Sequence, residues 1–264
     1  MKRNTLLFFI AFLCIIFIMH FFAIKVGEEK VENIAMRPTT FPTIEQKAKY
    51  IDRESRPPII MYHLIDSARA TNKYLYVSPK KLEKDLAYLK KKGYKSLFPE
   101  DVFDLEGAKK PVLITFDDGY ENNFTNAYPL LKKYKMKATI FVVSDRIGTE
   151  NYLNEEQIRE MSESGLVRIY SHTRTHADLT ELSLDEVEKE FAESNKAIYD
   201  ITGVEVVAVS YPGGHANGEI FEVAERYYNI GFMVGGPNAS FSRAINLQRQ
   251  TATEKIEIKK ILKD

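Results

Sequence analysis

Two adjacent carboxylates and two histidines are the residues of this sequence whose types and spacing could do chemistry together. Asp117 and Asp118 follow one short apolar run, and His172 and His176 follow another. Histidines four residues apart can lie on one side of a helical turn and converge on one metal ion. Neighbouring side chains of an extended segment diverge, so one carboxylate could bind the ion while the other accepts a proton.

Each cluster taken alone also has a structural interpretation. Aspartate is favoured at helix N-caps, DDG is a common turn sequence, and an isolated histidine pair is more often structural than metal-binding. The chain has only five histidines, however, and two of them occur together. Two imidazoles, one carboxylate and open positions for water suit Zn²⁺ or a similar transition metal in a hydrolytic site. Such a metal would acidify a water molecule and polarise a carbonyl, and the second carboxylate would take the proton.

A third polar segment is SYPGGH at residues 210–215, after another apolar run. Its proline and glycines permit a tight, exposed backbone whose N–H groups could face a substrate oxygen. A plain turn is the alternative interpretation of this segment.

The elements that must position these residues alternate along the chain. Helices are predicted between Ser78 and Gly93, Asn154 and Gly165, and Ser183 and Gly203, each with an N-cap signal and a terminal glycine. Thr251 with Glu254 predicts the start of a last short helix. Buried strands are predicted from β-branched runs at 59–62, 112–116, 138–143, 166–170, 204–210 and 230–234.

This alternation of strands and helices predicts an α/β fold with a parallel sheet covered by helices. The pattern alone does not separate a closed barrel from an open doubly wound sheet. Both architectures place their chemistry at the C-terminal ends of the strands, which is where the three polar segments fall.

Composition and charge exclude several functions. The 37 basic and 37 acidic residues give a net charge of zero, so we expect no nucleic-acid partner. The single cysteine, Cys14, excludes an intramolecular disulfide, and it is expected to be a small apolar side chain in a membrane.

The N-terminus predicts a membrane anchor. Residues 5–24 are nearly all apolar, and 20 residues at about 1.5 Å each span roughly 30 Å, the thickness of a hydrocarbon core. Lys2 and Arg3 precede this segment, which predicts a cytoplasmic N-terminus and an extracellular body. The alternative is a secreted protein whose signal peptide is cleaved, although no clear cleavage site is present. We therefore expect a cytoplasmic N-terminus at 1–4, a transmembrane anchor at 5–24, a stalk at 25–57 and a catalytic domain at 58–264.

The order TFDDGY, SHTRTH and YPGG resembles the NodB-homology polysaccharide deacetylases, carbohydrate esterase family 4, over about residues 58–250. The resemblance implies a distorted (β/α) barrel that removes acetyl groups from N-acetylated sugars. It implies that Asp117 is the catalytic base and that Asp118, His172 and His176 are the metal ligands. Gly213, following Pro212, is implied to offer its backbone N–H to the developing oxyanion, and Tyr211 is implied as a second residue that contacts the oxyanion or the substrate.

Departures from the family pattern leave the general acid open. Ser210 stands where the family often has arginine, the chain has no Trp for a late Asp–Trp motif, and the terminal Leu-x-His is missing. His63, in "IMYHLI", is the candidate replacement, because the first and last strands of a closed barrel can be neighbours. His215 is a rival candidate. These features are similar to the branch that acts on poly-β-1,6-N-acetylglucosamine.

The expected function is therefore a metal-dependent hydrolase of linear amides, which removes N-acetyl groups from a cell-surface or extracellular N-acetylglucosamine polymer of a cell wall or biofilm. The expected cofactor is a divalent metal, Zn²⁺ first, with Co²⁺ or Ni²⁺ as alternatives. The expected partners are the acetylated amino-sugar polymer and the membrane. Two alternatives stay open: a glycan-binding protein with little or no activity on the same scaffold, and an O-acetyl esterase.

Overall fold

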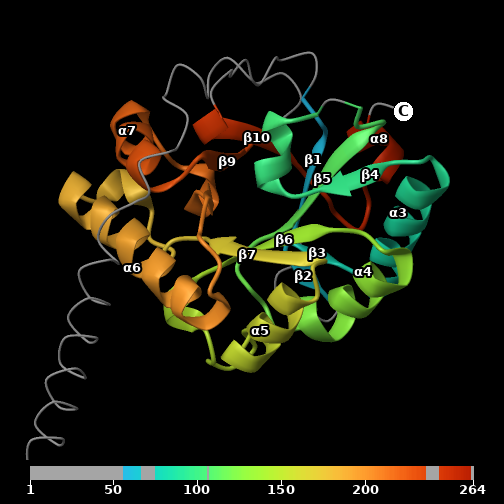
Figure 1. Ribbon diagram of the computed structural model, residues 1–264, viewed down its shortest axis with the longest axis horizontal. Coiled ribbons are helices and arrows are strands. Elements are labelled where there is room, and N and C mark those ends of the chain that lie inside the picture. Colours follow the sequence, from blue (N-terminus) through green and yellow to red (C-terminus); the bar gives the residue numbers. More distant parts are fainter. Residues whose placement is uncertain (1–55, 67–74, 106, 236–243, 263–264) are drawn as a thin grey trace, which may run out of the picture. The chain divides into compact units, whose positions relative to one another are not determined.

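The computed structural model describes residues 56–66, 75–105, 107–235 and 244–262 (Figure 1). All of them belong to one compact unit, Ile44–Asp264. The anchor predicted at residues 5–24 and almost all of the predicted stalk lie outside the described residues. Among the residues that are described, no helix has the length and apolar character needed to cross a membrane.

Seven parallel strands close into a barrel. Going around the barrel the order is β1-β10-β9-β8-β7-β6-β5, and β5 pairs again with β1. A short eighth strand, β4, extends the sheet by pairing with the first half of β5. The barrel strands are β1 (Ile59–Tyr62), β5 (Pro111–Phe116), β6 (Ala138–Val142), β7 (Val167–Ser171), β8 (Ala208–Ser210), β9 (Ile230–Val234) and β10 (Leu247–Thr251), with β4 at Lys95–Leu97. The separate pair β2 (Leu64–Ile65) and β3 (Tyr76–Val77) is also parallel.

The barrel strands are apolar runs because both of their faces are buried, one in the barrel and one under helices. Every residue of β1 and β6 is buried. Closure depends on β1, which lies between the last strand and β5: Met61 is in register with both Thr251 of β10 and Thr115 of β5. The sequence-based expectation of a barrel is therefore confirmed.

The helices surround the strands (Figure 1). Ser78 caps α3 by accepting from the Lys81 N–H. Asn154 with Gln157, and Ser183 with Glu186, form the predicted capping boxes of α5 and α6. The helices are α3 (Pro79–Lys91), α4 (Tyr128–Tyr134), α5 (Glu155–Glu163), α6 (Leu184–Thr202), α7 (Gly218–Tyr227) and α8 (Ile258–Leu262). Short turns of 3-10 helix lie at Pro99–Phe103, Ser144–Arg146, Leu179–Glu181, Pro212–Gly214 and Ala244–Asn246, and a π-turn lies at Asn123–Ala127.

Two predictions about elements were wrong, and one barrel strand was not predicted. The strand predicted from residue 204 begins only at Ala208. The last helix does not open at Thr251, which ends β10; Glu254 instead accepts hydrogen bonds from the backbone and side chain of Ser78. Strand β10 was not predicted, because its sequence LQRQT is mostly polar and reads as a loop.

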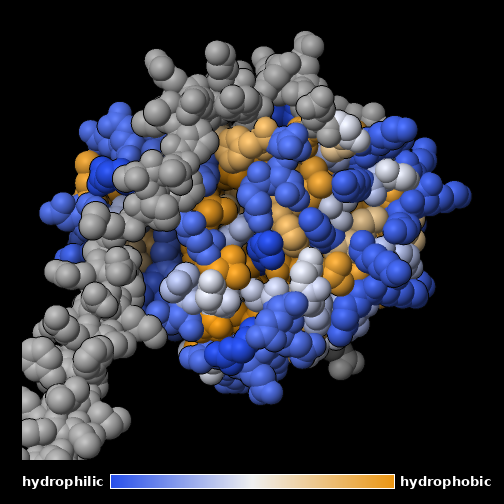
Figure 2. Space-filling model, viewed as in Figure 1, coloured by the Kyte–Doolittle hydropathy of each residue, from blue (hydrophilic) through white to orange (hydrophobic). Residues whose placement is uncertain are grey.

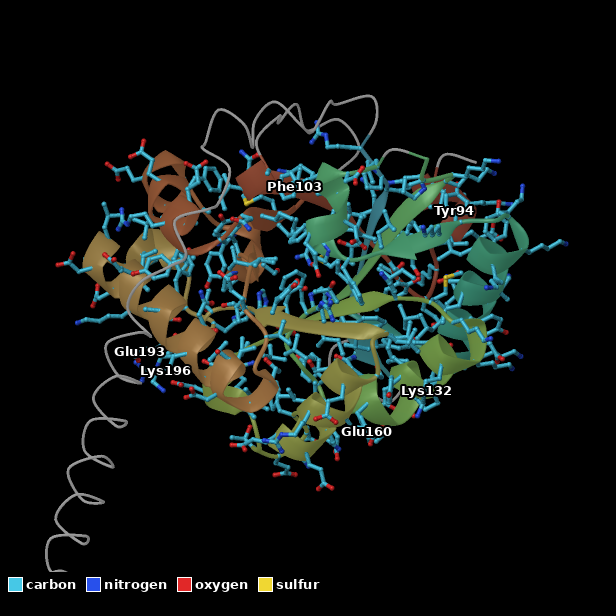
Figure 3. The ribbon with its side chains drawn as sticks, viewed as in Figure 1. Tyr94, Phe103, Lys132, Glu160, Glu193 and Lys196 are labelled. Atoms are coloured by element: carbon cyan, nitrogen blue, oxygen red, sulfur yellow. The ribbon has the colours of Figure 1, made fainter. Side chains whose placement is uncertain are left out.

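Polar side chains dominate the outline of the visible face, and apolar side chains gather towards its middle (Figure 2). Some of the polar groups link neighbouring helices. Lys132 of α4 and Glu160 of α5 lie 3.9 Å apart at the surface (Figure 3). Exposed pairs of this kind contribute little to stability, so the buried strands and the helix faces that cover them hold the barrel together.

Candidate active site

The two aspartates end strand β5 in a sharp turn. Asp118 and Gly119 both have left-handed backbones, with φ of 75° each. A Cβ on Gly119 would lie 2.9 Å from the Cγ1 of Val142, so only glycine fits there. The turn separates the two carboxylates: Asp117 contacts groups inside the barrel, and Asp118 faces the histidine pair.

The two histidines follow strand β7 in a loop. The expected helical turn is wrong, because Thr173 and His176 adopt left-handed backbones with φ of 64° and 68°. The loop nevertheless brings the imidazoles together, with ring centroids 4.9 Å apart. The predicted convergence is therefore present, although non-helical backbone angles produce it.

Asp118, His172 and His176 form a compact donor set. The Oδ1 atom of Asp118 lies 3.4 Å from the Nε2 atoms of both histidines. All three ligand atoms lie within 4.8 Å of one another. Two atoms bound at about 2.0–2.1 Å to one tetrahedral ion lie roughly 3.4 Å apart, so this donor set fits Zn²⁺ or an ion of similar size.

The partners of His172 also suit metal binding. Its Nδ1 lies 2.7 Å from the carbonyl oxygen of Ser210, so the Nδ1 proton is donated there and Nε2 is left to act as a ligand. Burial lowers the pKa of His172, but the charges of Asp117 and Asp118 outweigh burial and raise it. Burial raises the pKa of Asp118, but the neighbouring imidazoles of His172 and His176 hold it well below its usual range. The negative charge at this point favours a bound cation.

The other carboxylate, Asp117, is held by an arginine that the sequence analysis did not identify. Arg249 binds both oxygens of Asp117, with Nη1–Oδ1 at 2.7 Å and Nη2–Oδ2 at 2.6 Å. The hydroxyl of Ser210 also donates to Asp117 Oδ2, at 2.9 Å. Burial raises the pKa of Asp117, but the charges of Arg249 and His172 outweigh it and lower the pKa. Asp117 is thus ionised and hydrogen-bonded by Arg249 and Ser210, and its role as the base stays a prediction.

Arg249 lies inside the barrel. It is fully buried on β10, and its guanidinium is 5.7 Å from the ring centroids of both Phe141 and Phe232. The arginine expected before the third motif is replaced by Ser210, whose hydroxyl accepts a hydrogen bond from Arg249 Nη2. An arginine in a short polar strand near the C-terminus was the only signal in the sequence, and it did not indicate a partner.

His63 follows β1 beside the aspartates. Tyr62 is in register with Phe116, and the Asp117 N–H donates to the Tyr62 carbonyl at 3.0 Å. Burial lowers the pKa of His63; the charges of Asp117 and Asp118 act on the imidazole in the opposite direction, and the pKa stays below its usual value. The structure therefore brings the predicted acid next to the predicted base.

The third polar segment is divided between core and surface. The Tyr211 side chain is fully buried, and its hydroxyl donates to the Ile245 carbonyl at 3.0 Å. The ring therefore packs in the core, and the contact of Tyr211 with an oxyanion or substrate stays a prediction. Gly213 has a left-handed φ of 63°, and a Cβ there would lie 3.5 Å from the His215 ring. The contact of the Gly213 N–H with an oxyanion stays a prediction.

His215 lies on the outside of this segment. Its Nδ1 is 2.5 Å from Asp178 Oδ2, and both side chains are exposed. No described contact joins His215 to the aspartate pair, whereas His63 directly follows Tyr62, whose carbonyl accepts a hydrogen bond from the Asp117 N–H at 3.0 Å. The geometry therefore favours His63 over His215 as the proton donor.

Comparison with known proteins agrees with this geometry. A family model described as polysaccharide deacetylase matches residues 104–229. The crystal structure of BA0330 from Bacillus anthracis, which is named for this family, is 31% identical with a TM-score of 0.72; the match covers 77% of this chain and 67% of that one. The chain belongs to the polysaccharide deacetylase family. The sequence resemblance to NodB-type deacetylases is thereby confirmed.

Two relatives of known sequence extend the comparison. YxkH of Bacillus subtilis (strain 168), also named for this family, is 38% identical over 189 residues, which are 70% of this chain and 65% of YxkH. A poly-β-1,6-N-acetyl-D-glucosamine N-deacetylase of Staphylococcus aureus (strain MSSA476) is 31% identical over 159 residues, 52% of this chain and 53% of the relative. The chain thus spans less than two thirds of the length of either relative.

Proposed function

We propose that this chain is a metal-dependent hydrolase that removes N-acetyl groups from an N-acetylglucosamine polymer at the cell surface or outside the cell. The observation that carries the proposal is that a metal-ligand set and a separate ionised carboxylate lie side by side at one end of the barrel. Asp118, His172 and His176 form a donor set for one divalent ion. Asp117, a second carboxylate outside this set, lies beside them and is ionised. A protein that only binds glycans has little use for a second carboxylate beside the metal ligands.

The ligands and the base have separate tasks in this proposal. A divalent ion bound by the donor set would acidify a water molecule and polarise the acetyl carbonyl. Asp117 takes the water's proton, and Arg249 orients the carboxylate and keeps it ionised until then. Because the pKa of Asp117 is low, it is a weak base and suits a water that is already acidified.

The leaving group needs a proton when the carbon–nitrogen bond breaks. His63 gives this proton to the departing amine, and the other product is acetate. A lowered pKa makes the protonated form of His63 a ready donor. The N–H of Gly213 is proposed to bind the oxygen of the acetyl carbonyl as negative charge develops there.

The substrate class rests on chemistry and on one relative. The site is built for an acyl group, and the staphylococcal relative is named for poly-β-1,6-N-acetyl-D-glucosamine. We therefore propose this polymer, or a similar acetylated glucosamine chain, as the substrate, with Zn²⁺ as the metal and Co²⁺ or Ni²⁺ as replacements. We also propose that residues 5–24 anchor the chain in the cell membrane with the barrel outside.

The test is acetate release. The purified full-length chain, freed of metal with a chelator and reloaded with Zn²⁺, Co²⁺ or Ni²⁺, should release acetate from poly-β-1,6-N-acetylglucosamine oligomers. Asp117→Asn should lose at least about 100-fold in rate while still binding metal, because base catalysis contributes roughly 10²–10⁴-fold. A folded, metal-loaded wild type that releases no acetate but still binds the oligomers would contradict the proposal and favour the glycan-binding alternative.

A further inference from the structure

The loop that carries the metal-ligating histidines has an unfavourable backbone. Thr173 and His176 both have positive φ, and Thr173 is β-branched and fully buried. β-branched residues avoid this region strongly, so such a loop persists only where its surroundings fix it. Something outside the loop must therefore hold it in the conformation that brings the two imidazoles together.

Glu190 of α6 supplies the missing contacts. Its Oε2 accepts hydrogen bonds from the N–H groups of Arg174 and Thr175 at 2.9 and 2.8 Å. Its Oε1 accepts from the Thr175 hydroxyl at 2.9 Å. The three bonds come from Arg174 and Thr175, two of the three residues between His172 and His176, so one carboxylate fixes the centre of the loop.

Burial makes the hydrogen bonds to Glu190 stronger than the other contacts of this loop with α6. Glu190 is only 7% exposed, and glutamate is rarely buried unless its charge is satisfied. Hydrogen bonds from backbone N–H groups to a carboxylate are charge-assisted and stronger than neutral ones. The side chain of Arg174, by contrast, pairs at the surface with Asp145 and Glu193, and such exposed pairs are weak.

We propose that Glu190 is a positioning residue of the metal site, which sets metal affinity by holding the loop between His172 and His176. The proposal rests on the proposed function, since it requires that the two histidines bind a metal. No described contact joins Glu190 to His172 or His176, and Glu190 is not a catalytic residue. Its effect passes through the backbone of Arg174 and Thr175.

The test measures metal affinity without substrate. Calorimetric titration of the chelator-treated full-length chain with Zn²⁺ should show about 10- to 100-fold weaker binding for Glu190→Gln, the range expected when a partner behind the ligands is lost. Glutamine keeps the size of the side chain but loses its charge, so the bonds from the Arg174 and Thr175 N–H groups are no longer charge-assisted. Its amide nitrogen also replaces one acceptor with a donor, which faces either these N–H groups or the Thr175 hydroxyl. The Co²⁺ absorption spectrum should change as well, because the ligand geometry relaxes.

The matched control is Glu193→Gln. Glu193 lies one turn along the same helix (Figure 3) and contacts only the Arg174 side chain among the loop groups considered above. Glu193→Gln should leave Zn²⁺ affinity within about twofold of the wild type, because the ion pair between Glu193 and Arg174 is exposed and weak. Equal affinities of Glu190→Gln, Glu193→Gln and the wild type would overturn the proposal, even if Glu190→Gln melts at a lower temperature.

A milder variant covers the case in which Glu190→Gln does not fold. Thr175→Val removes the hydroxyl bond to Glu190, together with the longer 3.3 Å bond that the hydroxyl accepts from the Ala177 N–H. It should weaken Zn²⁺ binding by a few fold. Unchanged binding in this variant would then count against the proposal. Saturating Zn²⁺ should restore acetate release in Glu190→Gln, because positioning affects metal occupancy and not the chemical step.

Failure of the proposed function gives a different pattern. His176→Ala removes a metal ligand, so its Zn²⁺ affinity is the reference for a disrupted metal site. A wild type that binds Zn²⁺ no better than His176→Ala would refute the metal site itself and the role of Glu190 with it. A wild type that binds Zn²⁺ but releases no acetate would refute the hydrolase and leave the Glu190 result valid.

Discussion

Asp117 and Asp118 are identical side chains in adjacent positions with different environments. A left-handed backbone at Asp118 turns the second carboxylate towards the histidine pair. The first stays inside the barrel, where Arg249 and Ser210 occupy its oxygens. The different partners, and not the residue type, separate the proposed ligand from the proposed base.

Arg249→Met should therefore be strongly destabilising. The substitution removes one partner of a buried ion pair and leaves the Asp117 charge uncompensated, which costs about 3–5 kcal/mol. Denaturant unfolding should show this loss, and acetate release should fall because Asp117 is neither oriented nor held ionised. Arg226→Met, which breaks only an exposed pair with Glu188, should change the unfolding free energy by less than about 1 kcal/mol. Similar losses in the two variants would argue against a buried Arg249–Asp117 pair.

The Asp178 carboxyl should titrate unusually low. The Thr180 hydroxyl, and after it His215, lower the pKa of Asp178 to about 2. The unfolded value is about 3.9, so this carboxylate adds stability above that pH and loses it as the pH falls through about 2. His215→Ala should raise the pKa only in part, because Thr180 remains. Carbon NMR of the side chain measures it, and a return to about 3.9 would show that His215 is the main cause.

At the scale of elements, the turns after β5, β7 and β8 carry the aspartate pair, the histidine pair and the glycine turn of the site, and the parallel strands bring these turns to one end. Each turn contains left-handed residues: Asp118 with Gly119, Thr173 with His176, and Gly213 with Gly214. Left-handed backbone allows a chain to leave a strand abruptly and direct side chains across the barrel mouth. These turns are therefore the elements most sensitive to backbone substitutions.

Gly119→Ala should cost more stability than Gly93→Ala. Gly119 and Gly93 have left-handed φ angles of 75° and 77°, so alanine at either position costs about 1–2 kcal/mol of stability. Only at Gly119 does the new Cβ meet another group, Val142 at 2.9 Å, which adds roughly 1–3 kcal/mol of overpacking. Urea unfolding measures the difference, and Zn²⁺ affinity should fall only in Gly119→Ala. Equal losses would mean that Val142 moves aside freely.

At the scale of the whole molecule, barrel closure brings the two ends of the domain sequence together. Strand β1 pairs with β10 and with β5. His63, next to β1, and Arg249, on β10, thereby reach the same aspartates from opposite ends of the chain. If the sheet were open between β1 and β5, β1 and β10 would lie at the side of the sheet away from β5, and the aspartates would lack both groups.

His63→Gln should separate catalysis from metal binding. We expect acetate release to fall by about 100-fold or more, with Zn²⁺ affinity within a few fold of the wild type, because His63 is not part of the donor set. His215→Gln, an exposed histidine paired with Asp178, should change the rate by less than about threefold. The reverse result would assign the proton to His215.

Much of the fold was predictable from local patterns. The six apolar runs predicted as strands all contain strands, and the three segments with an N-cap residue and a terminal glycine are helices. Burial of both strand faces and helix capping leave strong local signals in a sequence. Strand β10 was missed because its inward side chain is Arg249, a charged residue in a polar run. The burial of the Tyr211 ring could not be foreseen, because its neighbours in sequence belong to the site while its ring packs against the core.

The amino-acid sequence by itself determined which groups stand at the ends of successive strands: two carboxylates, two imidazoles and a glycine turn. Only the tertiary structure decided which groups contact them. Arg249 reaches Asp117 across 132 residues of chain, and Glu190 fixes a loop whose backbone angles no local pattern predicts. The physical reason is that strand order and barrel closure create these contacts, and residues far apart in the chain leave no local signal of their pairing.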